Sequence, residues 1–224
     1  MCGRFTLTLD PAQLREAFPG LLIPDDLRSR YNIAPSQPVI AIPNTGENNL
    51  EFFTWGLIPS WSKDPSIGSR LINARAETVA EKPAFRSSFR RRRCLILSDG
   101  FFEWKLDSSG KSKTPYYIHL QSKKPFDFAG LWDTWLHPDG SEIRSCAIIT
   151  TSPNELMQPI HTRMPVILPI DSYQLWLDSS EQQPNKLSNL LVAYPSSEMS
   201  AYPVSKIVNA PQNDTPDCIK PVSA

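Results

Sequence analysis

The sequence predicts an α+β fold with a single domain, in which short, mostly antiparallel strands curl into an irregular barrel-like core with short helices at its periphery. The chain has 224 residues, of which 40% are hydrophobic, and this suits one domain with a sizeable core. Its 22 prolines favour short strands and irregular loops over a helical bundle, because proline interrupts regular hydrogen bonding. Since no repeat or linker divides the chain, we expect one domain over residues 1–224, with an irregular tail after about residue 214.

Charge and cysteine content narrow the classes of protein to which the chain can belong. Lys and Arg number 23, as do Asp and Glu, so any affinity for nucleic acid must come from an uneven distribution of charge. The four cysteines form no Cys-x-x-Cys pair and no targeting sequence precedes them, which predicts a cytosolic protein with free thiols and no metal site. No apolar run approaches the ~18 residues that a membrane helix needs.

Alternation of apolar and polar residues predicts strands along most of the chain. The expected strands cover residues 5–9, 38–42, 50–55, 94–97, 101–105, 114–120, 126–132, 145–151, 166–168 and 199–205. Asp10 and Pro11 predict a helix over 10–18, and a capping-box pattern from Ser152 predicts another that ends at residue 159. Further helices are expected towards residue 85, over 171–177 and near 185–191, and residues 30–35 are expected to be irregular.

The N-terminus offers two neighbouring nucleophiles. Methionine aminopeptidases remove Met1 in front of small residues, so the mature chain would begin at Cys2, with a free α-amine and a thiol on adjacent carbons. Both groups titrate near ~8 to ~8.5 in model compounds, and a 1,2-aminothiol condenses with an aldehyde to an imine and then to a thiazolidine ring. The alternative is that Cys2 belongs to a disordered terminus. The strand expected directly after it favours a terminus that is held in place.

A loop aromatic and a run of arginines indicate a surface for nucleic acid. Trp61 stands in a loop broken by glycine and proline, where no regular element can bury it, and an exposed ring can stack on a nucleobase. Four arginines, beginning with Arg90, lead directly into a strand. One concentrated basic patch in a neutral chain predicts contacts with phosphates. The alternatives are a buried indole and an ordinary solvated face.

Four further residues are candidates for a reaction centre or its surroundings. Glu103 stands among aromatic residues in an expected strand, where desolvation raises the pKa of a carboxyl group and suits it to proton transfer. His161 lies in a turn before an expected strand, from which side chains project into sites. Asn73 and Arg75 are expected either in a cleft or at the start of a helix. An outward-facing Glu103 and a structural His161 are the alternatives.

Six segments together resemble the SOS response-associated peptidase (SRAP) family. They are Cys-Gly-Arg-Phe at 2–5, Arg-Tyr-Asn-Ile-Ala-Pro at 30–35, Trp-Gly-Leu-Ile-Pro-Ser-Trp at 55–61, Asn-Ala-Arg at 73–75 followed by Glu77, Asp-Gly-Phe-Phe-Glu-Trp at 99–104, and His161 with Arg-Met-Pro at 163–165. The resemblance extends from residue 2 to about residue 209. One departure is Ser62, where some relatives have a second aromatic residue, and it affects how flanking bases would be stacked.

The resemblance implies a sensor of abasic sites in single-stranded DNA, which traps the ring-opened sugar aldehyde as a thiazolidine and has lyase activity as a side reaction. By position, it assigns the crosslink to Cys2, the orientation of that cysteine to Asn73, and proton transfer to Glu103 and His161. It also implies a set of residues that contact DNA: Arg4, Trp61, Arg75 and Arg163.

The expected partner is therefore single-stranded DNA that contains abasic sites, and no cofactor, metal or membrane is expected. We expect a monomer in the cytoplasm, associated with the nucleoid in a bacterium, or in the nucleus of a eukaryote. Two other functions stay open. One is a cysteine peptidase without a DNA role, in which Cys2 is the nucleophile and His161 the base. The other is a non-covalent reader of modified cytosine, which would bind through its arginines and Trp61.

Overall fold

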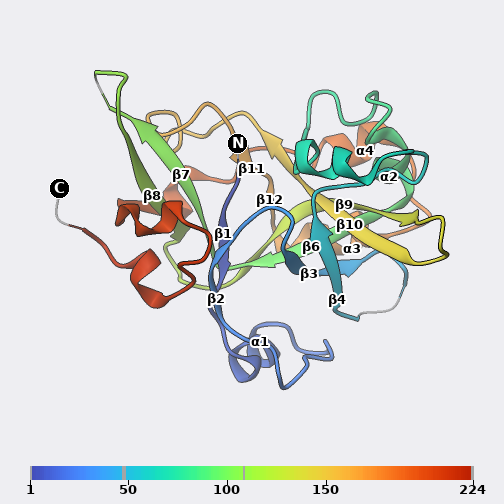
Figure 1. The fold of residues 1–224 in the computed structure, drawn as a ribbon, viewed down its shortest axis with the longest axis horizontal. Helices are drawn as coiled ribbons and strands as arrows, with labels where there is room; N and C mark the ends of the chain where they lie inside the picture. Colours follow the sequence, from blue (N-terminus) through green and yellow to red (C-terminus); the bar gives the residue numbers. More distant parts are fainter. Residues whose placement is uncertain (1, 47–48, 108, 223–224) are drawn as a thin grey trace.

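The computed structural model describes residues 2–46, 49–107 and 109–222, and it confirms the α+β class that the sequence predicts (Figure 1). Strands predominate and pair mostly antiparallel in two sheets, while the helices are short and lie outside these sheets. The expected removal of Met1 concerns a residue outside the described ranges.

Among the described residues, five strands close into a barrel. In order around it they are β10 (Glu142–Thr151), β4 (Glu51–Trp55), β3 (Pro38–Pro43), β6 (Arg93–Ser98) and β9 (Phe126–Leu136). The ring closes because β9 pairs in turn with β10. Within the ring β4 and β10 run parallel, and the other neighbours are antiparallel. Closure satisfies the strand edges that an open sheet would leave exposed.

Three short strands extend the barrel. Beyond its pairing with β9, the end of β10 lies between β5 (Asn73–Arg75), which runs parallel to it, and β11 (Met164–Pro165), which runs antiparallel. β12 (Ile167–Leu168) pairs with β9. One strand end therefore holds two segments that are far apart in the sequence, around residues 73–75 and 161–165.

A second sheet is antiparallel throughout its described pairings. Its order is β13 (Met199–Pro203), β8 (Lys113–Leu120), β7 (Gly100–Leu106), β1 (Phe5–Leu7) and β2 (Arg30–Ile33). In Figure 1 the β7–β8 hairpin projects from the body of the molecule. The sheet therefore has a part that covers the barrel and a part that extends beyond it.

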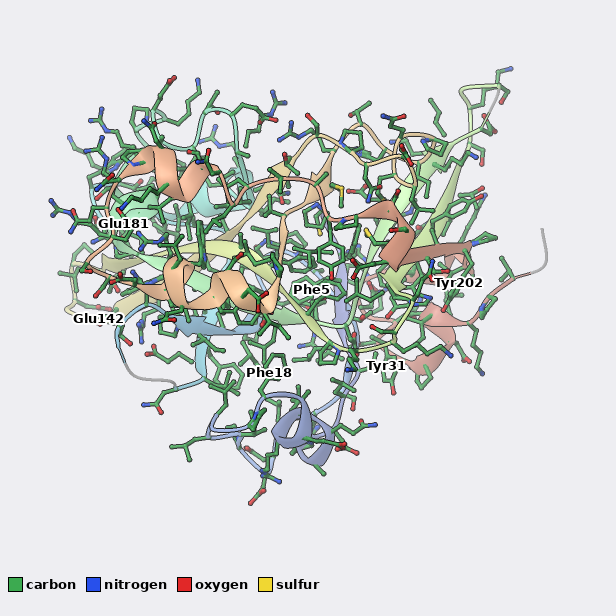
Figure 2. All side chains as sticks on the ribbon, turned by 180° about the vertical axis from the view of Figure 1, so that it is seen from behind. Phe5, Phe18, Tyr31, Glu142, Glu181 and Tyr202 are labelled. Atoms are coloured by element: carbon green, nitrogen blue, oxygen red, sulfur yellow. The ribbon has the colours of Figure 1, made fainter. Side chains whose placement is uncertain are left out.

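Both faces of the second sheet carry apolar side chains. On one face Phe5 and Phe101 join the main core, and the ring of Phe5 meets Trp55 and Phe128 edge to face, at centroid distances of 5.1 and 5.6 Å. Figure 2 shows Phe5 near the middle of the molecule. The opposite face carries a smaller cluster of buried residues: Phe102, Tyr117, Val204, Val208 and Cys218.

The helices are short segments around the two sheets. The α-helices are α1 (Pro11–Ala17), α2 (Arg86–Arg91), α3 (Tyr173–Leu177) and α4 (Pro184–Ser188). The 3₁₀ helices are η1 (Pro65–Arg70), η2 (Ile170–Ser172), η3 (Ser196–Glu198), η4 (Lys206–Asn209) and η5 (Pro216–Ile219). At α1 the predicted cap is confirmed, because Asp10 accepts a hydrogen bond from the Gln13 amide and the Gln13 side chain accepts one from Asp10.

The expectation of an irregular segment at residues 30–35 was wrong, because residues 30–33 form β2. The Asp214 carboxylate accepts hydrogen bonds from the amides of Tyr31 and Asn32, at 2.5 and 2.8 Å, and pairs with Arg30. The buried Asn32 side chain donates to three carbonyl groups of the C-terminal region. The segment after Asp214, which was expected to be irregular, contains η5 and the buried Cys218.

The helix expected after Ser152 was also wrong, because residues 155–160 form hydrogen-bonded turns. Asn154 does cap the Met157 amide, at 3.0 Å, as the start of a helix requires. Pro159 has no amide hydrogen to donate to the Glu155 carbonyl, which interrupts the helical pattern, although the Ile160 and His161 amides still donate to the Met157 carbonyl. The helical alternative for residues 73–77 does not occur either, because residues 73–75 form β5.

Arg93 differs from the other arginines of the predicted basic run, because it is fully buried. Its guanidinium donates five hydrogen bonds to backbone carbonyls, over distances of 2.6 to 3.1 Å. The acceptors are Phe89, Arg90, Trp176, Asp178 and Glu181. Burial lowers the pKa of Arg93 to about 10. Arg93 thus joins α2 to the end of α3 and does not reach a phosphate.

We expect Arg93→Met to lower the free energy of unfolding by about 3–5 kcal/mol, because it leaves buried carbonyls without donors. Urea denaturation measures the change. Arg91→Met is the matched control, since Arg91 is exposed in the same segment, and it should stay within about 0.5 kcal/mol of the wild type. Equal losses in the two variants would contradict a structural role for Arg93.

Candidate active site and nucleic-acid interface

Cys2 lies in the interior of the protein, next to the predicted positioning residue. Its exposed fraction is 0%, and its carbonyl oxygen accepts a hydrogen bond from Asn73 Nδ2 at 2.9 Å. The Cys2 Sγ atom lies 3.9 Å from the carbonyl oxygen of Arg4. The sequence alternative of a disordered terminus is therefore wrong for Cys2, because this residue is packed and hydrogen-bonded.

The strand registers explain how these residues meet. β1 and β7 are antiparallel with Phe5 opposite Phe101, so the residues before Phe5 run alongside β7 towards Glu103. Asn73 begins β5 opposite Ile148 of β10. Asn73 therefore belongs to the sheet of the barrel and Glu103 to the second sheet, and both lie near the N-terminal residues around Cys2.

Glu103 and His161 form the second half of the site. Glu103 is buried, and its carboxylate oxygen Oε2 lies 3.9 Å from His161 Nε2. The Arg163 amide donates to His161 Nδ1 at 3.0 Å. We assign the neutral imidazole proton to Nε2 on this basis, because an Nδ1 that accepts from the amide cannot also donate to the Arg163 carbonyl, 3.1 Å away. The protonated nitrogen then faces Glu103.

Burial dominates the electrostatics of the site. Burial raises the pKa of the Glu103 carboxyl above its ordinary value, and the nearby His161 opposes that rise. Burial, and then the charge of Glu103, raise the pKa of the Cys2 thiol far above its ordinary range. The thiol is therefore protonated at neutral pH and needs a neighbouring base to react. A buried carboxyl group whose oxygen lies 3.9 Å from an imidazole nitrogen is placed to exchange a proton with it.

Two of the predicted DNA-binding arginines are engaged with the protein itself. Arg4 donates to the side-chain oxygen of Asn32 and to the carbonyls of Val208 and Asn209, over 2.6 to 3.0 Å. These bonds fasten the chain two residues after Cys2 to η4. Arg4 is therefore a structural anchor for the N-terminal segment.

Arg163 forms a two-pronged ion pair with Glu77. Its Nη1 and Nη2 atoms lie 2.6 and 2.9 Å from the two carboxylate oxygens, and Nη2 also donates to the Thr150 carbonyl at 2.6 Å. The hydrogen bond from Arg163 lowers the pKa of Glu77. Since the Arg163 amide also holds His161, this pair fixes the turn that carries the imidazole. The sequence did not single out Glu77 for this role, because the partner of a charged residue depends on the tertiary fold.

Other predicted DNA contacts lie on the surface. Arg75 and Arg90 are exposed, and Trp61 has an exposed fraction of 59%. The loop of Trp61 is held from β9 on both sides, because the Asp133 carboxylate accepts from the Ser60 amide and the Trp135 indole donates to the Ser62 carbonyl. The ring is thus presented to solvent from a fixed backbone, which confirms that Trp61 is exposed.

Beside Trp61 lies an open hollow of about 370 Å³, lined by Trp61, Pro83, Arg86 and Ser87. Arg86 and Arg90 are four residues apart in α2 and share one helix face. Arg86 was not among the predicted DNA contacts, although its helical spacing from Arg90 points to it. Of the run that was expected to hold phosphates, Arg92 pairs with Asp133 and Arg93 is buried, so that part of the expectation was wrong.

Other features of the described residues lie apart from this site. A hollow of about 980 Å³ opens between α1 and α3, beside Phe18 and Tyr173, and none of the predicted site residues lines it. Among the described residues, no cluster of three or more His, Cys, Asp or Glu side chains could hold a metal ion. No helix in the described part of the chain is long and apolar enough to cross a membrane.

Comparison with known proteins gives consistent matches along the chain. The family described as SOS response associated peptidase (SRAP) matches residues 1–211. The chain is 46% identical to the abasic site processing protein YoqW of Bacillus subtilis, over 98% of this chain and 99% of that protein. It is 33% identical to the abasic site processing protein HMCES of Xenopus tropicalis, over 98% and 78%. A crystal structure of a Bacteroides thetaiotaomicron protein has a TM-score of 0.86 at 28% identity, covering 99% of this chain and 100% of that one.

The free energy of unfolding of Glu103→Gln should increasingly exceed that of the wild type as the pH rises above about 4.5. Since burial raises the folded-state pKa, the wild type has its full stability below the unfolded pKa and loses part of it as the pH rises towards the folded pKa. The advantage of Glu103→Gln should grow by at most about 1.4 kcal/mol per pH unit. Urea denaturation between about pH 5 and 8 measures it. The exposed Glu142→Gln is the control, and an equal pH trend in both variants would contradict the assignment.

Proposed function

The chain belongs to the SOS response associated peptidase (SRAP) family, and we propose that it senses abasic sites in single-stranded DNA and traps them covalently through Cys2. One observation supports this most strongly: Cys2 is buried, its carbonyl is held by Asn73, and its thiol is close enough to Glu103 of the Glu103–His161 pair to feel that charge. The relatives YoqW and HMCES are named abasic site processing proteins, and this chain spans 99% and 78% of their lengths. Their names support abasic-site DNA as the partner.

The proposed reaction begins at the α-amine of Cys2, once the peptide bond after Met1 has been cleaved, by the protein itself or by an aminopeptidase. The amine attacks the aldehyde carbon C1′ of the ring-opened sugar and forms a carbinolamine. Loss of water then gives an imine. Asn73 holds the Cys2 carbonyl and so orients the amine, and loss of such positioning costs ~10²-fold in rate.

The second step closes the ring. The Cys2 thiol adds to the imine carbon, its proton passes to the imine nitrogen, and a thiazolidine results with no change of oxidation state. Because the pKa of the thiol is raised, the step needs a proton acceptor, and Glu103 lies near enough for its charge to act on this thiol. Glu103 and His161 carry the proton in this proposal, a contribution typically worth ~10²–10⁴-fold.

A lyase side reaction follows from the same imine. If a base removes a proton from C2′ before the thiol closes the ring, β-elimination expels the 3′ phosphate and cleaves the strand. In this proposal the Glu103–His161 pair is that base. Crosslink and cleavage then compete for one intermediate, and a thiol packed beside the reacting carbon favours the crosslink.

The proposed DNA surface combines exposed cations with one aromatic ring. Arg75 and Arg90 contact phosphates, and Trp61 stacks on a base next to the abasic site. Arg4 and Arg163 contribute through the segments that they hold, and Arg163 reaches DNA only if a phosphate replaces Glu77 at its guanidinium. Single-stranded DNA fits best, because stacking on Trp61 requires an unpaired base.

The peptidase alternative has less support from the geometry. A cysteine peptidase needs a thiolate stabilised by an imidazolium. Here burial and Glu103 raise the pKa of the thiol, and His161 Nε2 faces Glu103. A reader of modified cytosine would bind DNA without using Cys2, and the following experiment separates it from the crosslinking function.

Cys2→Ala should bind DNA but form no stable adduct. The experiment incubates the protein with an oligonucleotide carrying one abasic site, followed by denaturing electrophoresis, with intact mass to establish loss of Met1. The wild type should give a band that survives denaturation, while Cys2→Ala should give one only with a borohydride reductant, because its α-amine forms an imine that cannot close. A stable adduct from Cys2→Ala without reductant would refute the proposal. An oligonucleotide without the abasic site is the control.

Glu77→Gln should raise the non-covalent affinity for single-stranded DNA by about 2- to 5-fold at low salt, because it removes a negative charge from the surface and loosens the pair with Arg163. Fluorescence anisotropy with an unreactive abasic analogue at about 50 and 200 mM salt measures the effect, which should shrink at the higher salt. Glu16→Gln, an exposed site on α1, is the control for net charge. A fall in affinity would show that the ion pair itself shapes the binding surface.

A further inference from the structure

The cationic side chains around the site differ in whether they already form hydrogen bonds or ion pairs within the protein. Arg4 donates to backbone carbonyls, and Arg163 is paired with Glu77. Farther along the surface, Arg92 is paired with Asp133. A strand of DNA that crosses the site must therefore find other cations, and Arg75 supplies one of them.

Lys105 occupies such a place on the β7–β8 hairpin, in the same strand as Glu103. Both residues lie on β7, where Glu103 is opposite Tyr116 and Lys105 is opposite Thr114. Residues two apart in a strand point to the same face and are separated by roughly 7 Å. Lys105 therefore extends from the same face as Glu103, two residue pairs farther along the projecting β7–β8 hairpin (Figure 1).

The aromatic ring of Tyr116 holds the Lys105 ammonium in place. The Nζ atom lies 5.9 Å from the centre of the Tyr116 ring, within the range of a cation–π interaction. Both residues are half-buried, so the stem is constrained while the head group meets solvent. In the described ranges, no carboxylate lies within ion-pair distance of Lys105, in contrast to Arg163.

We propose that Lys105 binds a DNA phosphate on the hairpin side of the abasic nucleotide, an inference that rests on the proposed function. A compact ammonium beside the site, held by an aromatic ring and without an acidic partner in the described residues, suits a phosphate oxygen. In Figure 1 the chain that leads into β1 lies between the β7–β8 hairpin and α2. The DNA strand then runs from Trp61 and α2, past Cys2, to Lys105.

The test compares Lys105→Gln with Lys113→Gln. Lys113 lies opposite Leu106, one position along the same hairpin, so its side chain leaves from the other face and the two variants lose the same charge. Anisotropy with a single-stranded oligonucleotide that carries an unreactive tetrahydrofuran abasic analogue gives the affinity at several salt concentrations. Denaturing electrophoresis with a reactive abasic site gives the crosslinking rate at saturating protein.

We expect Lys105→Gln to weaken binding about 3- to 10-fold at low salt and to reduce the slope of log affinity against log salt by ~0.7, the value for one phosphate contact on a single strand. Lys113→Gln and Lys105→Arg should keep the wild-type slope. The crosslinking rate at saturating protein should stay unchanged in Lys105→Gln, because Cys2 and Glu103 are intact.

Three results would overturn the inference: an unchanged slope in Lys105→Gln, an equal loss in Lys113→Gln, or a lower saturating rate with the slope intact. The last result would mean that Lys105 acts on Glu103 and not on a phosphate. A wild-type protein that neither binds nor crosslinks the abasic oligonucleotide would instead refute the proposed function, so the two failures are distinguishable. A reduced salt slope in Lys105→Arg as well would contradict a role for the charge, because this variant keeps it, and would point to a disturbed fold.

Discussion

The pairing of β9 with β10 is the constraint on which the rest of the structure depends. It runs from Glu142 opposite Leu136 to Ile148 opposite Gly130 and closes the barrel. The barrel interior is so tight at Gly130 that an added Cβ atom would lie 2.7 Å from Cys94 Sγ. Because β10 continues past this pairing, its free end can receive β5 and β11. Barrel closure thus fixes where the Asn73 and His161 segments meet.

The barrel also positions the N-terminal strand β1. Phe5 inserts between Trp55 and Phe128, and this contact draws the preceding residues into the interior. Burial brings Cys2 and Glu103 together and raises the pKa of both groups, which opposes their charged forms. The site therefore holds a carboxyl group at a cost to stability, as expected where proton transfer is needed. An apolar residue at position 103 would suit the core better but could not carry a proton.

The sequence predicted elements whose signal is local. The capping residues of α1 and the alternation in strands such as β7 and β8 identified those elements closely. It missed β2, because that strand depends on Asp214, which is more than 180 residues away in the chain. In the site, the residue types pointed to Cys2, Glu103 and His161, but nothing in the sequence separated the buried Arg93 from the exposed Arg90. Such differences arise only when helix ends and carbonyls are placed in space.

A protein with zero net charge can still present a basic surface if its acidic groups are used elsewhere. Four arginines away from Cys2 are paired with carboxylates: Arg15 with Asp25, Arg30 with Asp214, Arg92 with Asp133 and Arg144 with Glu51. In the described part of the chain, Arg75, Arg86, Arg90 and Lys105 have no carboxylate within ion-pair distance. Positive charge is therefore left uncompensated around these four residues because carboxylates pair with arginines elsewhere, and not because the chain as a whole is basic. An exposed carboxylate such as Glu77 weakens the resulting positive potential locally, so the Glu77–Arg163 pair limits the positive charge beside His161.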